Sequence, residues 1–373
     1  MNPIITAAGD PTISANRDGL FYMAAFGWEL PQGQLVLLPR ISHTVSTNPS
    51  GTAYEWLQRA LSPSPAGSSI LERPQIAVDR TTGNNSESKY LCTTYRNANL
   101  QTAIWVAQRP ASSPDYTSSI QVSDVRTYPS RVDGCQVAVA PDGGVYVAWW
   151  EELDQGGGSK ISVIKLRRSP GGLSFGPTVI ASNWFVKPKD ASATSDCSEG
   201  SGGLADSAPA LKGHIRSYPF PSLAVSKATG TVYIAYNRLP LSGSGSQIAF
   251  VRSTNQGATW SNPLVVNDSA VGDKYMPAVA VSDYNNYVKV IWYDRRNDPN
   301  NLNIDVYSAV SSNSGSSFGQ NVRLTNAPFG IPRLFPHYDC RTGDFWPQPA
   351  SCDLGDHIST AGFATTSGFL QSC

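Results

Sequence analysis

The chain has 373 residues, and its 28 basic and 28 acidic side chains give a formal net charge of zero. Only 15% of the residues are charged, against roughly 25% in an average globular protein. Such a chain has no long-range field to gather polyanions, so we expect no nucleic-acid partner. It contains no apolar run of about 18 residues, so we expect no membrane span, and its first residues lack the basic and apolar regions of a secretion signal.

A pattern of apolar strand, polar turn and apolar strand recurs along the chain. Its five full copies begin at Pro11, Pro74, Cys135, Pro221 and Pro277, and a sixth, degenerate copy begins at His357. The starts are 56 to 86 residues apart, which is too long for one hairpin and fits a four-stranded antiparallel blade with variable loops. No segment keeps a helical period over three turns, so the sequence predicts an all-β protein built as a β-propeller.

The repeat predicts one domain over residues 1–373, with blades starting near residues 11, 74, 135, 221, 277 and 357 and with insertions at 178–220 and 325–356. The sixth copy has only about 17 residues before the chain ends. We favour a six-bladed propeller whose short last blade is completed by an N-terminal strand. The alternatives are five blades followed by a tail, or an open last blade that accepts a strand from another chain.

A second motif falls at matching points of the copies. Residues 253–260 read STNQGATW and residues 311–318 read SSNSGSSF, and residues 168–175 and 46–54 carry weaker versions. Ser and Asn side chains cap the backbone groups of a tight turn, and Gly takes the left-handed conformation. We expect the aromatic residue at the end of the motif to pack between neighbouring sheets.

These turns resemble the Asp-box of sialidases and related β-propellers, with asparagine in place of aspartate. Residues 291–298 (IWYDRRND) and 354–357 (LGDH) also resemble stretches of secreted sialidase-like propellers. The resemblance implies three arginines on a sugar carboxylate, a tyrosine nucleophile supported by a glutamate, and an aspartate acid/base. The Arg-Ile-Pro motif of the family's first blade is absent here, so no catalytic residue is carried over by motif.

Charged residues gather at the ends of the second strands of several copies, although the chain is poor in charge. The candidates for substrate binding are Arg96, Arg238 and Arg296, and the candidates for catalysis are Glu151, Asp294 and Tyr338. Guanidinium forks match carboxylates, so the three arginines are expected to hold an anionic group, while the carboxyl groups act as acid and base. Alternatively, each arginine pairs with a neighbouring acid and only fastens the blades together.

Six cysteines stand at positions 92, 135, 197, 340, 352 and 373, without a CxxC motif. An even number with wide spacing fits disulfides in an oxidising compartment, whereas six buried free thiols are the alternative. Cys340 and Cys352 bracket an irregular stretch and are the predicted pair.

No metal site is predicted from the four scattered histidines. The oxygens of Asp294, Asp298 and Asp305, with the asparagines between them, are of the kind that calcium prefers, but their spacing is not that of an EF-hand. We therefore predict no cofactor, with a structural calcium ion as the alternative.

These observations together predict a secreted, sialidase-like propeller that binds a glycan or glycoconjugate at the rim of its central channel. Whether it also hydrolyses the glycan, by exo-sialidase-type chemistry, is left open. The alternative is a non-catalytic extracellular module for adhesion or assembly. In that case, the open last blade would join copies of the chain.

Overall fold

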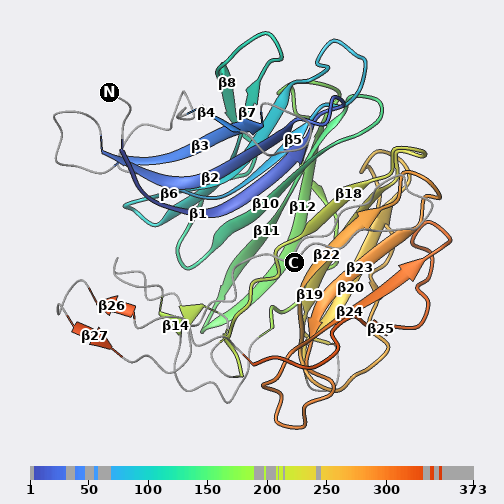
Figure 1. The fold of residues 1–373 in the computed structure, drawn as a ribbon. Coiled ribbons are helices and arrows are strands. Elements are labelled where there is room, and N and C mark those ends of the chain that lie inside the picture. The colour runs from blue at the N-terminus through green and yellow to red at the C-terminus, as the bar shows by residue number, and fades with distance from the viewer. Residues whose placement is uncertain are drawn as a thin grey trace. The chain divides into compact units, whose positions relative to one another are not determined.

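The structure is a computed structural model that describes residues 4–30, 38–46, 54–57, 69–188, 197–198, 207–208, 210–212, 215–240, 245–330, 337–339 and 344–346. These residues form strands and loops and no helix (Figure 1). Within the same ranges, no segment therefore has the helical length and apolarity needed to cross a lipid bilayer. The prediction of an all-β protein is confirmed.

Five antiparallel sheets of four consecutive strands carry the five full copies of the repeat. The first contains β1 (Ile4–Ala15), β2 (Phe21–Leu30), β3 (Leu38–Ser46) and β4 (Tyr54–Leu57). The second contains β5 (Ser69–Val78), β6 (Lys89–Asn97), β7 (Gln101–Arg109) and β8 (Ser118–Gln121), with the short β9 (Arg126–Thr127) also paired to β7. The third contains β10 (Arg131–Val139), β11 (Val145–Gly156), β12 (Ser159–Ser169) and β13 (Val179–Ile180).

The fourth sheet contains β18 (Ser222–Val225), β19 (Val232–Arg238), β20 (Gln247–Ser253) and β21 (Leu264–Val265). The fifth contains β22 (Lys274–Val281), β23 (Val288–Asp294), β24 (Asp305–Ser311) and β25 (Val322–Arg323). Three two-stranded ribbons lie in the predicted insertions: β14 (Cys197–Ser198) with β15 (Ser207–Ala208), β16 (Ala210–Leu211) with β17 (Ile215–Arg216), and β26 (His337–Asp339) with β27 (Asp344–Trp346). The sixth copy, from His357, lies outside the described residues.

The chain divides into two compact units. Unit 1 consists of Met1–Trp184, Phe220–Ile234 and Val251–Asn262, and unit 2 consists of Phe185–Pro219, Ala235–Phe250 and Pro263–Cys373. The strands of the fourth sheet are divided between them. A single domain over the whole chain and a ring of six blades therefore stay predictions.

The first strand of the copies that begin at Pro74, Cys135 and Pro277 contains a β-bulge. The register against the second strand shifts between Glu72 and Gln75, between Asp133 and Gln136, and between Tyr275 and Ala278. Inside these bulges Arg73, Gly134 and Met276 have φ angles of 52°, 63° and 49°, and each stands directly before the residue at which a copy of the sequence repeat begins. A left-handed residue and an unpaired one are the usual ingredients of a bulge. In these three copies the sequence repeat therefore starts inside the bulge and continues into a strand pair.

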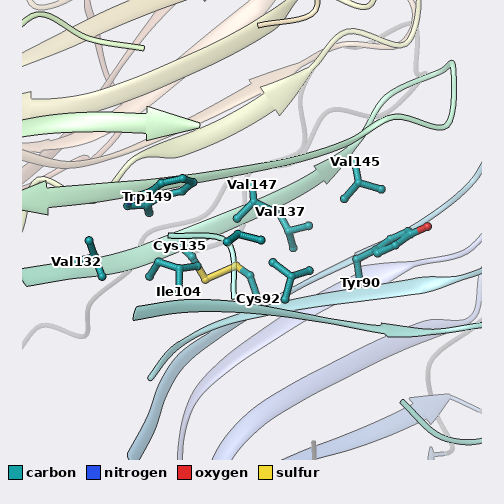
Figure 2. Close-up of a cluster of buried hydrophobic side chains, with 11 residues drawn as sticks. Tyr90, Cys92, Ile104, Val132, Cys135, Val137, Val145, Val147 and Trp149 are labelled. Carbon is teal, nitrogen blue, oxygen red and sulfur yellow. A yellow bond between two sulfur atoms is a disulfide. The ribbon is translucent and has the colours of Figure 1, made fainter. Parts of the chain in front are cut away.

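A disulfide between Cys92 on β6 and Cys135 on β10 joins the second and third sheets inside unit 1. Both cysteines are buried, and Ile104, Val132 and Trp149 belong to the same apolar cluster (Figure 2). The sequence predicted disulfides, and this one is present. The specific pair Cys340 and Cys352 lies outside the described residues.

The two better motif copies form turns with the same hydrogen bonds. In the first, Ser253 Oγ accepts from the Gly257 amide at 2.9 Å, and Asn255 Oδ1 accepts from the Thr259 amide at 3.0 Å. In the second, Ser311 and Asn313 accept in the same way from Gly315 and Ser317, at 2.9 and 3.0 Å. The Phe318 ring that ends the second copy packs edge to face on Phe250 of the neighbouring sheet, with centroids 4.9 Å apart. The predicted capping and left-handed glycine are therefore present in both copies, and the predicted inter-sheet aromatic is present in the second. The assignment of these turns as Asp-boxes stays a prediction.

Gly134 tests how tightly the bulge is packed. A Cβ atom there would lie 2.0 Å from Cδ1 of Phe220, and the φ angle of 63° already disfavours a side chain. We expect Gly134→Ala to lower the free energy of unfolding by roughly 2–5 kcal/mol, from overpacking and left-handed strain together. Gly157→Ala is the matched control, because Gly157 has φ 60° with nothing within 4 Å of its Cβ position, and should cost only about 1 kcal/mol. Urea denaturation measures both, and equal costs would contradict the packing argument.

The buried disulfide should be a major source of stability. It closes a sequence separation of 43 residues, for which the chain-entropy estimate is about 4 kcal/mol. We expect the double variant Cys92→Ala/Cys135→Ala to lose stability of this order by chemical denaturation. The wild-type protein should lose a similar amount when it is unfolded and refolded under reducing conditions. A variant as stable as the oxidised wild type would show that the disulfide does not contribute to the free energy of unfolding.

Candidate functional site

The strand ends of unit 1 gather the charged side chains that the sequence singled out there. The antiparallel register of β10 and β11 places Arg131 opposite Glu152 and Val132 opposite Glu151. In the preceding sheet, Glu72 of β5 lies near the end of β6, and Arg96 of β6 donates to its carboxylate at 2.9 Å. We refer to the charged residues Glu72, Arg73, Arg96, Arg126, Arg131, Asp133, Glu151, Glu152, Lys160 and Lys165 as the strand-end cluster.

Glu151 is the most enclosed acid of this cluster, with a side chain only 1% exposed. Its Oε1 accepts from Arg126 Nε and Nη2 at 3.0 and 2.7 Å, and Lys165 Nζ lies 2.8 Å from Oε2. Two cations thus cover both oxygens of one buried carboxylate, which compensates for much of its desolvation. In this arrangement the predicted acid/base Glu151 is the centre of an ion triplet.

Glu152 points to a second group of cations, beside an exposed aromatic ring. Arg131 and Lys160 lie 3.9 and 3.6 Å from its Oε1. The Lys160 ammonium also lies 5.6 Å from the ring centroid of Tyr128, which is 42% exposed. An exposed tyrosine ring beside hydrogen-bonding cations offers an apolar face together with polar edges.

Asp133 and Arg73 were missed as candidate residues. Arg73 Nη1 donates to both Asp133 oxygens at 3.3 and 3.1 Å, and the Thr94 hydroxyl donates to Oδ1 at 2.9 Å. The guanidinium also lies 5.2 Å from the ring centroid of Phe220. Their position along the chain was the available signal. Arg73, Gly134 and Phe220 each stand immediately before a copy of the repeat, and Asp133 precedes Gly134.

In unit 2, the buried Asp294 and the half-buried Arg296 form an ion pair at the end of β23. Asp294 Oδ2 accepts from Arg296 Nε and Nη2 at 2.9 and 2.7 Å and from Trp292 Nε1 at 2.8 Å. Arg296 also donates to Asp268. Burial would lower the pKa of Arg296, but its bonds to the two carboxylates outweigh burial and raise it. The predicted substrate-binding arginine and the predicted acid/base are therefore bound to each other.

The other predicted site residues of unit 2 are Arg238 and Tyr338. Arg238 is buried, and Gln247, with its amide oxygen toward the guanidinium, accepts from Nη2 and Nε at 3.1 and 2.9 Å. Tyr338 lies in β26, for which only the backbone is described. Because Arg96 and Glu151 belong to unit 1 and the remaining four to unit 2, their convergence on one site stays a prediction.

The carboxylates proposed for calcium already accept hydrogen bonds from the protein. Asp298 accepts from the backbone amides of residues 300, 302 and 303. Asp305 accepts from Asn297, Arg323 and Thr325. No group of three or more His, Cys, Asp or Glu side chains suited to a metal is found among the described residues. These residues therefore do not fit a calcium ion as they are arranged.

No protein-family model and no curated protein sequence matches this chain. Solved structures do resemble it. A sialidase from the Hadza microbiome, Hz136, aligns with a TM-score of 0.51 at 12% identity over 87% of this chain and 60% of its own, so the chain spans less than two thirds of that protein. The GH93 α-L-arabinofuranosidase of Fusarium graminearum aligns with a TM-score of 0.52 at 11% identity, over 84% of this chain and 80% of its own. The α-L-arabinanase of Penicillium chrysogenum aligns with a TM-score of 0.51 at 12% identity, over 86% of this chain and 82% of its own. At these identities the likeness shows the fold, which is a β-propeller.

The ion triplet around Glu151 predicts a strong dependence on its two cations. We expect Arg126→Met/Lys165→Met to cost about 3–5 kcal/mol, because the variant leaves a buried carboxylate without a counter-charge. Adding Glu151→Gln should recover much of that loss in urea denaturation. Arg17→Met is the control, since its ion pair with Glu87 is partly exposed and should be worth less than about 1 kcal/mol. A double variant that is as stable as the control would show that Glu151 does not need the cations.

Proposed function

We propose that this protein binds glycans through the strand-end cluster of unit 1. The observation that carries the proposal is the exposed ring of Tyr128 beside Lys160, whose ammonium lies 3.6 Å from the buried acid Glu152. A sugar offers C–H groups for stacking on a ring and hydroxyl groups for bonds to cations and carboxylates, so it matches this combination of groups. The propeller fold supports the proposal, because a sialidase, an arabinofuranosidase and an arabinanase are built on it.

Exo-sialidase-type hydrolysis is the finer proposal. It assigns substrate binding to Arg96, Arg238 and Arg296, and catalysis to Glu151, Asp294 and Tyr338. Glycoside hydrolysis requires a carboxyl group or a supported tyrosine at the scissile bond. Glu151 would have to exchange Arg126 or Lys165 for the substrate, and Asp294 would have to exchange Arg296, because these cations now cover their oxygens.

A non-catalytic extracellular module is the second candidate function, and a specific observation favours it. Glu151, Asp133 and Asp294 are each buried and each bound to an arginine or lysine. Such carboxylates orient neighbouring cations and hold strand ends together, which a binding surface requires as much as an active site does. The buried Cys92–Cys135 disulfide supports an oxidising, extracellular compartment for either candidate. Assembly through the last blade concerns residues outside the described part of the chain.

The proposal predicts that Tyr128 contributes directly to glycan affinity. We expect wild-type protein to retain glycans on an array, and Tyr128→Ala to weaken the best ligand at least about tenfold by calorimetry, which corresponds to about 1.4 kcal/mol. Tyr284→Ala is the matched control, because Tyr284 is 66% exposed in the turn between β22 and β23, and should leave affinity unchanged. Absence of binding to any glycan, or equal effects of the two variants, would overturn the proposal.

Hydrolysis is tested separately with fluorogenic sialosides and α-L-arabinofuranosides. Turnover of a sialoside that is lost in Arg238→Ala, with the fold retained by circular dichroism, would support the sialidase assignment. Glycan binding without turnover of either substrate would exclude it and leave the non-catalytic module.

A further inference from the structure

Arg295 is a buried arginine that none of the functions above uses. It follows directly after β23 in unit 2 and is only 1% exposed. Its backbone amide donates to the Asp273 carbonyl at 3.0 Å, and a Cβ on Gly272 would lie 2.7 Å from its carbonyl carbon. The backbone around Arg295 is therefore packed closely, and the position of its side chain is fixed by the chain that crosses it.

The guanidinium of Arg295 is bonded along one side only. Nη1 donates to the Lys212 carbonyl at 2.7 Å and lies 3.9 Å from Asp273 Oδ2. Asp273 is already a bonded acid, since Oδ1 accepts from the Ser246 amide at 3.0 Å and Oδ2 from Asn301 Nδ2 at 2.7 Å. Asp273 thus compensates for the charge of Arg295 only from a distance.

The other side of the guanidinium is open. Nε and Nη2 of Arg295 are buried and have no hydrogen-bond partner among the described residues. These two nitrogens share one edge of the guanidinium, the edge that can donate two parallel bonds to one anion. A buried donor without a partner costs about 1–3 kcal/mol, and more when it is charged, so two on one edge indicate that a bonding group is missing.

A third buried donor, the Tyr275 hydroxyl, belongs to a ring that lies near Arg295. The ring centroid of Tyr275 is 5.4 Å from the Arg295 guanidinium carbon, and the Tyr275 hydroxyl also has no hydrogen-bond partner in the described part of the chain. Burial raises the pKa of Tyr275, and the nearby Arg295 opposes this rise only in part. The hydroxyl therefore keeps its proton at neutral pH and can donate it in a hydrogen bond.

The neighbouring charges do not supply the missing group. Arg296 is bound to Asp294 and Asp268, and Lys274 faces the same acids, so their oxygens are engaged by other cations and not by the open edge of Arg295. Lys274 donates to the carbonyl groups of Val271 and Gly272. Burial lowers the pKa of Lys274 to about 8, although the nearby acids oppose this shift. What remains at the open edge is a set of three donors without a bonded acceptor, two of them on a guanidinium, and a small anion is the acceptor that matches them.

We propose that Arg295 and Tyr275 form an internal binding site for a small monovalent anion. The Nε and Nη2 groups of Arg295 and the Tyr275 hydroxyl donate to one ion. Chloride and a small carboxylate such as formate share the required chemistry. The site would stabilise unit 2 by compensating for the charge of Arg295, independently of glycan binding.

The experiment has a solution arm and a crystallographic arm. We expect the melting temperature of the wild-type protein to be several degrees higher in sodium chloride or sodium formate than in sodium gluconate at equal ionic strength, because only a small anion fits and stabilises the folded state. In crystals soaked with bromide, an anomalous peak should lie within hydrogen-bonding distance of Arg295 Nε. Chloride and formate titrated separately distinguish the two ions by their half-saturating concentrations.

Two variants and one control separate a bound anion from a general salt effect. Tyr275→Phe keeps the ring and should shrink the anion-dependent shift at least about twofold, and Arg295→Lys, which lacks the two-nitrogen edge, should abolish it. Arg323→Met should retain the full shift, because Arg323 is bound to Asp305. If Arg295→Lys does not fold, the shift measured for Tyr275→Phe and the bromide peak still test whether an anion binds at this site. Equal shifts in all proteins would show a general salt effect and would overturn the proposal. No bromide peak and no shift in the wild type would overturn it as well, and would show that water satisfies this edge.

Discussion

The bulge in the first strand of three of the copies is the constraint on which the contacts at these strand ends depend. At Arg73, Gly134 and Met276 the backbone adopts positive φ angles directly before a copy of the repeat. The bulge shifts the register, so the residues before it and those after it face different neighbours. In unit 1 this places Asp133 against Arg73 and puts Gly134 under the ring of Phe220. A side chain on Gly134 would displace that ring, so the packing and the polar contacts at this strand end depend on the same residue.

Burial of acids explains the composition of the strand-end cluster. A chain with few charges has placed several of them in the interior, where each carboxylate requires a donor. Glu151, Asp133 and Asp294 meet this requirement with arginine or lysine. Arg295 is the contrasting case, because its open edge has no such partner. The same rule thus accounts for the ion pairs and identifies the position where one is missing.

The candidate site could be predicted only in part. Charged residues were expected at the ends of second strands, and Arg96, Glu151 and Asp294 lie there because the strand pairs could be read from the repeat. Their partners could not be predicted, since Glu72, Arg126 and Arg296 reach them through side-chain geometry and not through a motif. The roles of Arg73 and Asp133 were missed for the same reason. Their positions before the repeat were visible. However, the two residues are 60 positions apart in the sequence, and their contact joins two different sheets.

The sequence by itself determined the all-β class, the five strand-pair copies and the capped turns, because alternating apolar strands, Gly-containing turns and Ser and Asn caps act over short distances along the chain. It also indicated disulfides from the number and spacing of the cysteines. Only the tertiary structure decided that Cys92 joins Cys135, that Glu151 lies under Arg126 and Lys165, and that one edge of Arg295 is open. Those outcomes depend on which side chains meet across neighbouring sheets and on how completely they exclude water. The pattern of residues along a single strand does not encode these two quantities.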